Sequence, residues 1–211
     1  MSAALLALLA LQTPVDEGTL VVREDTVVIA REAFRLSTVR TGGGATRWTL
    51  ATTIRYDRSR PVVVLDPIVE LGPDSNPASL EYTVADPREP LRILGQLTRG
   101  RFTVRLLGRR TERAREFPAP PPSAVLDDSV FALYLPAAWQ GRSRAVSVTG
   151  VFPRGGRREL LMVQDSGGEV PLRHITISGG ENRLVHLWLQ ADGRLAKVAI
   201  PSRHLVAERA P

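Results

Sequence analysis

Apolar and polar residues alternate along most of the chain after residue 17, and this pattern constrains the fold more than any other feature of the sequence. In the stretch RFTVRLL at 101–107, the apolar residues include Phe102, Val104 and Leu106, with polar residues between them. Side chains of a β-strand point alternately to the two faces of a sheet, so such strands bury one face and expose the other. Antiparallel sheets typically have this pattern. It predicts strands at 18–23, 27–38, 47–56, 61–71, 79–85, 91–98, 101–107, 111–117, 144–152, 159–164, 170–178, 182–190, 195–200 and 204–209.

Short segments rich in glycine, proline, asparagine and aspartate separate these predicted strands. Glycine supplies positive φ, and Asn and Asp close local turns with their side chains. Connections this short join neighbouring strands into a meander, and a long twisted meander tends to curl, which removes exposed edges. We therefore expect a mainly all-β fold, an antiparallel meander curled into a half-barrel or open barrel. The length of 211 residues fits a single β domain at 18–211.

One segment interrupts the alternation. A proline-rich run at 118–122 leads into a stretch from Val130 to Leu135 that is nearly all apolar. Asp, Asp and Ser at 127–129 are residue types that cap helices, so we expect a short helix to follow them and to end at Pro136. Because its apolar side chains need burial on more than one side, we predict that the segment 124–139 packs as a helical lid or plug against the concave face of the sheet.

The first residues have the pattern of an export signal. An apolar run from Ala3 to Leu11 ends at a polar break, and it is too short to cross a bilayer as a helix. No basic residue precedes the run and no small-x-small cleavage pattern follows it, so a short buried helix is the alternative. The chain has no cysteine, which excludes lipid attachment and disulfides. We expect a signal peptide at 1–13 and a periplasmic or secreted product without a stable transmembrane anchor.

The net charge of +6 comes from arginine, since Lys197 is the only lysine. Nucleic-acid binders usually gather such charge in one patch with interleaved aromatic residues. Here arginines extend from Arg23 to Arg209, and we expect no nucleic-acid partner. The densest group lies at 99–115, where Arg101 and Arg105 are candidates for binding an anion. The preferred interpretation is a solvated strand face on which Glu112 and Glu116 partly pair with the arginines.

The sequence contains no complete catalytic or metal-binding signature. Asp-Ser-Gly at 165–167 matches half of an aspartic-protease site, which needs two carboxylates, and ordinary turn chemistry also explains it. His174, His186 and His204 lie on different predicted strands and lack the close spacing of metal ligands. Motifs for a serine nucleophile and a phosphate-binding loop are absent. We expect no enzymatic activity, no catalytic residue, no cofactor and no metal.

Three stretches carry a family resemblance: GTLVVREDTVVIAREAFRL near the start, VLDDSVFALYL in the centre and LVHLWLQADGRLAKVAIPSRHLVAER near the end. They resemble a group of uncharacterised secreted bacterial β-sheet proteins whose sheets are similar to the half-barrels of lipoprotein-localisation factors. The resemblance covers most of the mature chain, and its motifs are structural. It implies an envelope protein with a curved sheet and an apolar interior, and it brings no catalytic residues.

These observations lead to a ranked expectation of function. The first is a non-enzymatic envelope protein that binds a lipid or other amphiphile, with arginines near the rim pairing with anionic headgroups. The second is a structural or protein-interaction module with an envelope protein partner and no small ligand, and the third is an exported hydrolase. Packing of the core is the alternative role for the candidate ligand-binding residues, which are Phe131, Leu133, Tyr134, Leu135 and Trp139.

Overall fold

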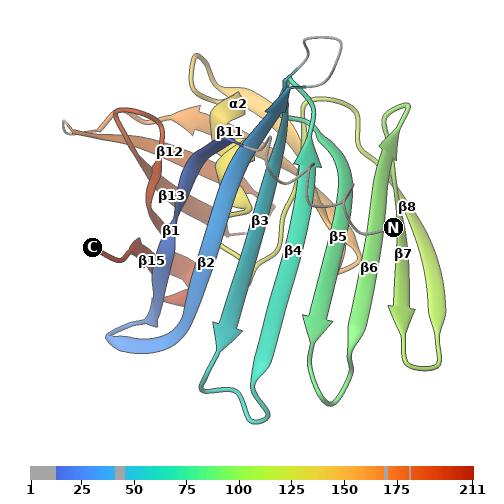
Figure 1. Cartoon of the computed structure of the whole chain (residues 1–211). Coiled ribbons are helices and arrows are strands. Elements are labelled where there is room, and N and C mark those ends of the chain that lie inside the picture. Colours follow the sequence, from blue (N-terminus) through green and yellow to red (C-terminus); the bar gives the residue numbers. More distant parts are fainter. Residues whose placement is uncertain (1–12, 41–45, 169–170, 181) are drawn as a thin grey trace.

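A single mainly antiparallel sheet of 15 strands makes up most of the protein (Figure 1). The computed structural model describes residues 13–40, 46–168, 171–180 and 182–211. The elements are β1 (Thr13–Glu24), β2 (Val27–Arg40), β3 (Thr46–Tyr56), β4 (Val63–Leu71), β5 (Pro77–Ala85), β6 (Leu91–Thr98), β7 (Arg101–Gly108), β8 (Glu112–Pro118), β9 (Ser123–Val125), α2 (Tyr134–Gln140), β10 (Val146–Phe152), β11 (Arg157–Asp165), β12 (Leu172–Gly179), β13 (Arg183–Gln190), β14 (Leu195–Ile200), the 3₁₀ turn η1 (Pro201–Arg203) and β15 (Leu205–Arg209).

The strand order is two meanders joined at the middle of the sheet. Strands β1 to β8 lie side by side in sequence order on one half, and β15 back to β9 form the other half. The halves meet where β1 pairs antiparallel with β15, in a register that places Leu20 opposite Arg209. Among the described strands, only β9 runs parallel to its neighbour, β10. The two edge strands, β8 and β9, are consecutive in the chain but are not paired, so the sheet is open.

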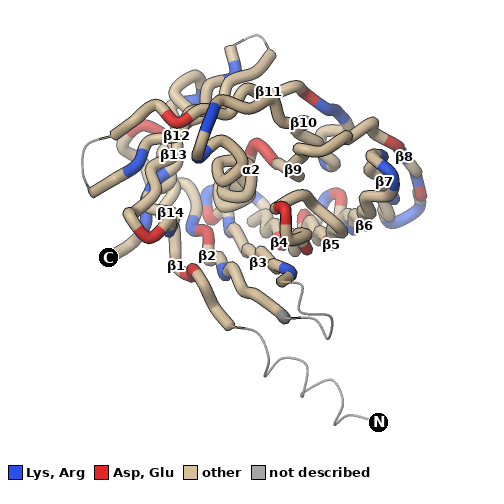
Figure 2. Tube along the Cα trace, turned by 90° about the horizontal axis from the view of Figure 1, so that it is seen from above, with Lys and Arg blue, Asp and Glu red and all other residues tan. Residues whose placement is uncertain are grey.

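The sheet curls around an interior that contains β9 and α2 (Figure 2). The edge strand β9 lies against the beginning of β5, where the Ser123 N–H donates to Asn76 Oδ1 over 2.7 Å. The β9 edge of the sheet therefore lies on the concave side of the half that contains β5. This architecture confirms the expected fold class, an antiparallel meander curled into an open barrel with one short helix.

The alternating sequence pattern matches the burial of the side chains. On β7, Phe102 and Val104 are fully buried, whereas Arg101, Thr103 and Arg105 are exposed. On the edge strand β8, every residue except Phe117 is exposed, and charged residues dominate it. Charged side chains on an exposed edge discourage pairing with another chain.

The segment 124–139 fills the concave side of the sheet, and we call it the plug. Its apolar side chains join the core, with Phe131, Tyr134 and Leu135 at 0% exposure. The predicted helix caps at 127–129 were wrong, because α2 begins only at Tyr134 and has no side-chain cap. Pro136 does not end the helix either. It lies in the first turn of α2, where a missing N–H costs little.

Each predicted strand corresponds to a strand of the sheet, and boundaries differ by a few residues. The largest difference is at β1, which begins at Thr13 rather than at residue 18, because its first residues pair with β2. Strand β9 was not predicted, since three residues after a proline run give no alternation. Of the expected signal peptide at 1–13, all but Thr13 lies outside the described residues.

Candidate functional site

A buried carboxylate on β2 holds the plug against the sheet. Glu32 is fully buried, and it accepts hydrogen bonds from Thr52 Oγ1 at 2.7 Å, Phe131 N at 2.8 Å and Ala132 N at 2.9 Å. Burial raises the pKa of Glu32 to about 7, although these hydrogen bonds favour the charged form. Glu32 therefore satisfies backbone donors of the plug that the sheet could not otherwise reach.

A second buried carboxylate, Asp127, ties the start of the plug to the β10–β11 turn. Arg154 donates two hydrogen bonds to it, Nε to Oδ2 and Nη2 to Oδ1, both at 2.7 Å. Tyr82 on β5 donates its hydroxyl to Oδ2 at 3.0 Å, and the Ser129 N–H donates to Oδ1 at 2.8 Å. The bidentate pairing is the geometry that makes arginine–carboxylate contacts strong.

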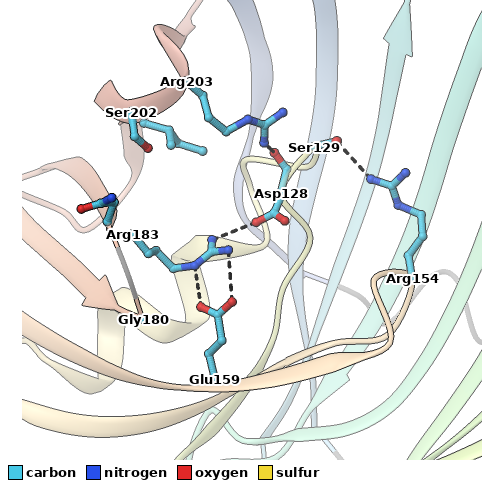
Figure 3. A pocket seen from close by; sticks show the side chains of 10 residues that line it. Asp128, Ser129, Arg154, Glu159, Gly180, Arg183, Ser202 and Arg203 are labelled. Carbon is cyan, nitrogen blue, oxygen red and sulfur yellow. Dashed lines mark hydrogen bonds and ion pairs between the residues drawn. The ribbon is translucent and has the colours of Figure 1, made fainter.

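The next residue, Asp128, belongs to a network of charges at the same end of the sheet (Figure 3). Its carboxylate accepts from Arg157 at 2.7 Å and from Arg183 at 2.8 Å, and both arginines also donate to Glu159. Burial opposes ionisation of Asp128, but the hydrogen bonds from Arg183 and Arg157 outweigh it and lower its pKa. The lowered pKa keeps Asp128 ionised near neutral pH, and Asp128 and Glu159 together form ion pairs with two arginines.

A pocket of about 470 Å³ opens beside this network, and we call it the arginine pocket. Arg203 lines it from η1 and donates from Nη1 to the Asp128 carbonyl oxygen. Arg154 lines it as well and donates to Ser129 Oγ at 3.0 Å. The lining consists of Asp128, Ser129, Arg154, Glu159, Gly180, Asn182, Arg183, Ile200, Ser202 and Arg203.

A second pocket, of about 330 Å³, lies where α2 ends, and we call it the tryptophan pocket. Trp48 of β3 and Trp139 of α2 line it with ring centroids 5.4 Å apart. Arg142 lies over the Trp139 ring, with its guanidinium carbon 5.2 Å from the ring centroid. Burial and the nearby positive charge of Arg173 lower the pKa of Arg142. The full lining is Val15, Asp16, Leu36, Trp48, Ser75, Trp139, Arg142, Asp192, Gly193 and Arg194.

The predicted ligand-binding residues separate into two groups. Phe131, Leu133, Tyr134 and Leu135 are at most 1% exposed and pack in the core, so they present no free surface. Trp139 is only partly buried and lines the tryptophan pocket. Of the five predicted residues, Trp139 alone therefore has surface that a ligand could contact in this structure.

The candidate anion-binding arginines on β7 have carboxylate partners on β8. Arg101 forms an ion pair with Glu116, and Arg105 donates to Glu112, with 2.9 Å from Nε to Oε1. All four side chains are about half exposed. Their charges are mutually compensated on the outer face, far from both pockets in the strand order.

Two of the three histidines are in contact on the outer face of the sheet, which their sequence spacing did not indicate. His174 Nε2 lies 2.8 Å from His186 Nδ1, and Trp188 stacks on His174 with ring centroids 4.9 Å apart. Burial and the neighbouring His186 lower the pKa of His174. Within the described ranges, no group of three or more His, Asp or Glu side chains is placed to hold a metal ion. His204 lies elsewhere, 3.3 Å from Asp25.

The sequence interpretation missed Glu32 and the arginines that hold the plug. A usable signal existed for Glu32, because it falls between Ala30 and Phe34 at an inward position of β2, where a carboxylate must find donors. No comparable signal existed for Arg154, since a turn arginine is ordinarily solvated.

The fold and the two pockets define an open, antiparallel, β-barrel-like protein whose interior is filled by its own plug. Among solved structures, the chain is similar to a β-barrel-like protein of a domain of unknown function, DUF1849, from Brucella abortus, with 11% sequence identity and a TM-score of 0.47. The match covers 92% of this chain and 93% of that chain. No protein-family model and no curated protein matches the sequence. No helix in the part of the chain that the structure describes is long and apolar enough to cross a membrane.

Proposed function

We propose that the chain is a non-enzymatic envelope protein that binds an anionic amphiphile in the tryptophan pocket. The observation that carries this proposal is an apolar wall with a half-buried arginine at its side. Trp48 and Trp139 provide apolar surface, and Arg142 lies over the Trp139 ring. Small-molecule sites are typically apolar clefts with a few well-placed polar groups.

The charge of Arg142 supports an anionic ligand. Among the described residues, no carboxylate forms an ion pair with it, whereas the nearby Arg173 is paired with Asp165. An anionic headgroup beside Arg142 would compensate this charge with hydrogen bonds to the guanidinium. The apolar tail would then cover the tryptophan rings and leave water.

The size of the pocket limits the tail. About 330 Å³ is at the low end of ligand pockets, which span roughly 300–1,000 Å³. We therefore propose a single-chain amphiphile, such as a fatty acid, rather than a lipid with two chains. We also propose a relation to the half-barrels of lipoprotein-localisation factors. Because the plug fills the interior of the curved sheet, the ligand would lie at its mouth.

The export of the protein is part of the same proposal. It is supported by the apolar leader pattern at 3–11. Expression of the full chain with a C-terminal tag, followed by fractionation and N-terminal sequencing, tests it. A mature product that begins close to Thr13 in the periplasm or medium is expected, whereas an intact Met1 in the cytoplasm would contradict export.

Titration with dodecanoate below its micelle concentration tests the amphiphile site through tryptophan fluorescence. We expect a saturable change, and Arg142→Gln should weaken binding about tenfold through loss of a charge-assisted contact. The matched control is Arg144→Gln, since Arg144 is an exposed arginine outside the pocket. No saturable change, or equal weakening by both variants, would contradict the proposal.

A second candidate function is a protein-interaction module, because the outer face of β11–β13 carries exposed apolar side chains. Leu160 is 66% exposed, Met162 45% and Leu184 38%. Met162 and Leu184 are both paired with Ser178 of β12, so they flank one position on that face. If dodecanoate does not bind, replacement of Leu160 and Met162 by serine should abolish association with an envelope protein partner in a cross-linking experiment.

A further inference from the structure

The charges around the arginine pocket do not cancel. Arg154 pairs with Asp127, and Arg157 and Arg183 share Asp128 and Glu159. For a fourth arginine, Arg203, the hydrogen bond within the described residues is to the Asp128 carbonyl oxygen, and it forms no ion pair with a carboxylate among them. The pocket therefore has one uncompensated positive charge, on a side chain that lines it.

Several hydrogen-bond donors in the pocket are also unused. Arg203 has five N–H groups and uses one of them within the described part of the structure. The Ser129 hydroxyl accepts from Arg154, which leaves its own hydrogen free to donate, and Ser202 adds a second hydroxyl to the lining. These donors have different origins, in the plug and in η1, but they line one volume.

Arg203 and Arg154 flank a single peptide unit. Arg203 donates to the carbonyl oxygen of Asp128, while Arg154 donates to the side chain of the next residue, Ser129, and the two side chains approach from different sides (Figure 3). A tetrahedral oxyanion has enough terminal oxygens to accept from both guanidinium groups and a serine hydroxyl. A planar carboxylate offers only two oxygens, so this geometry favours phosphate.

We propose that the arginine pocket binds the phosphate group of a small phosphate ester, with Arg203 as the principal ligand-binding residue. The volume of about 470 Å³ exceeds what a bare phosphate ion needs, so the remainder of the pocket accommodates the polar body of the ester. The site is independent of the proposed amphiphile site. Arg183 at the start of β13 lines one pocket, and the turn after the end of β13 lines the other.

Isothermal titration calorimetry in a low-salt, phosphate-free buffer tests the proposal with the full chain. Glycerol 3-phosphate is expected to bind saturably, and glycerol is expected not to bind. Arg203→Gln should weaken glycerol 3-phosphate binding about tenfold or more, because it removes the uncompensated charge. The matched control, Arg110→Gln, changes the net charge equally at an exposed arginine of the β7–β8 turn and should leave affinity unchanged.

Two further measurements make the result decisive. Amide chemical-shift mapping of the wild-type protein with glycerol 3-phosphate should place the largest shifts at 128–129 and 202–203, a readout that does not depend on any variant.

Soluble dihexanoyl phosphatidic acid then distinguishes the source of the phosphate. Tighter binding that still needs Arg203 identifies a lipid headgroup, and equal binding identifies a soluble ester. Absence of saturable binding, shifts elsewhere, or equal loss in both arginine variants would overturn the proposal.

Discussion

Arg154 donates two parallel hydrogen bonds, both 2.7 Å long, to the buried carboxylate of Asp127. The Asp127 residue is 4% exposed, whereas the Arg154 side chain remains 34% exposed. The pair links the first residues of the plug to the β10–β11 turn. Removing one member of a buried ion pair leaves an uncompensated charge, which costs more than the pair itself contributes.

Arg154→Ala is expected to lower the free energy of unfolding by about 3 kcal/mol, because Asp127 would stay buried without its cation. Urea unfolding followed by tryptophan fluorescence measures the change. Arg101→Ala serves as the control, since Arg101 pairs with Glu116 on the exposed face, and such pairs contribute under about 1 kcal/mol. Similar losses in the two variants would show that Asp127 does not depend on Arg154.

Glu32 is expected to make stability fall as the pH rises from about 4.5 to about 7. In the unfolded chain its carboxyl ionises near the ordinary value of 4.5, whereas burial raises the pKa to about 7 in the folded protein. Between these values the folded state retains a proton that the unfolded state has released, so a rise in pH favours unfolding. At about 1.4 kcal/mol per pKa unit, this contribution is about 3 kcal/mol.

Glu32→Gln isolates this effect, because glutamine does not titrate. The difference in unfolding free energy between wild type and variant, measured by urea denaturation at several pH values, should shift by about 3 kcal/mol in favour of the variant across this window. Below pH 4.5 and above pH 7 the difference should be constant. A difference that is independent of pH would mean that Glu32 titrates alike in both states.

Phe131→Ala tests whether the plug is part of the core. The side chain is fully buried, so its truncation should cost about 3–5 kcal/mol through lost burial and a residual cavity. Leu160→Ala is the control, because Leu160 is 66% exposed and its loss should change stability by less than about 0.5 kcal/mol. A small effect of Phe131→Ala, with intact folding, would instead favour a plug that detaches from the sheet.

Gly141 after α2 allows the helix to lie close to β11. A Cβ atom at this position would lie 2.5 Å from Val163 Cγ1 and 3.0 Å from the Val163 carbonyl carbon, neither of which moves easily. Gly141→Ala is therefore expected to cost about 1–3 kcal/mol in thermal or urea unfolding. Gly155→Ala should be nearly neutral, because the only close atom there is the flexible end of Arg157. Equal melting temperatures of the two variants would contradict this packing argument.

The fold followed from local features of the sequence, because alternation and turn residues act over a few positions. Phe102 and Val104 are buried as their positions in the alternation predicted. The continuous apolar residues located the plug in the sequence, but they did not predict its backbone conformation. The Phe131 and Ala132 N–H groups donate to Glu32, about a hundred residues earlier in the chain, and the first donors of α2 bond to backbone carbonyl oxygens of the preceding turn instead of a side-chain cap.

The pockets could not be predicted, because their residues come together only in the folded chain. Arg203 and Ser129 are distant in the sequence, and neither lies in a recognisable motif. In the densest arginine group of the sequence, the two candidate anion-binding residues, Arg101 and Arg105, form ion pairs with neighbouring glutamates. In the arginine pocket, the arginine without a carboxylate partner among the described residues is the turn residue Arg203, which composition does not distinguish from the others.

The folding of this protein depends on the pairing of β1 with β15, the two strands of the sheet that lie farthest apart in the sequence. Each meander consists of contacts between sequence neighbours, which form quickly, whereas the central seam closes a loop of nearly the whole chain and forms late. Until Val22 and Ala207 meet across this seam, both strands present unpaired backbone next to apolar surface. Concentration-dependent misassembly between chains would begin there, rather than at the charged margin of β8.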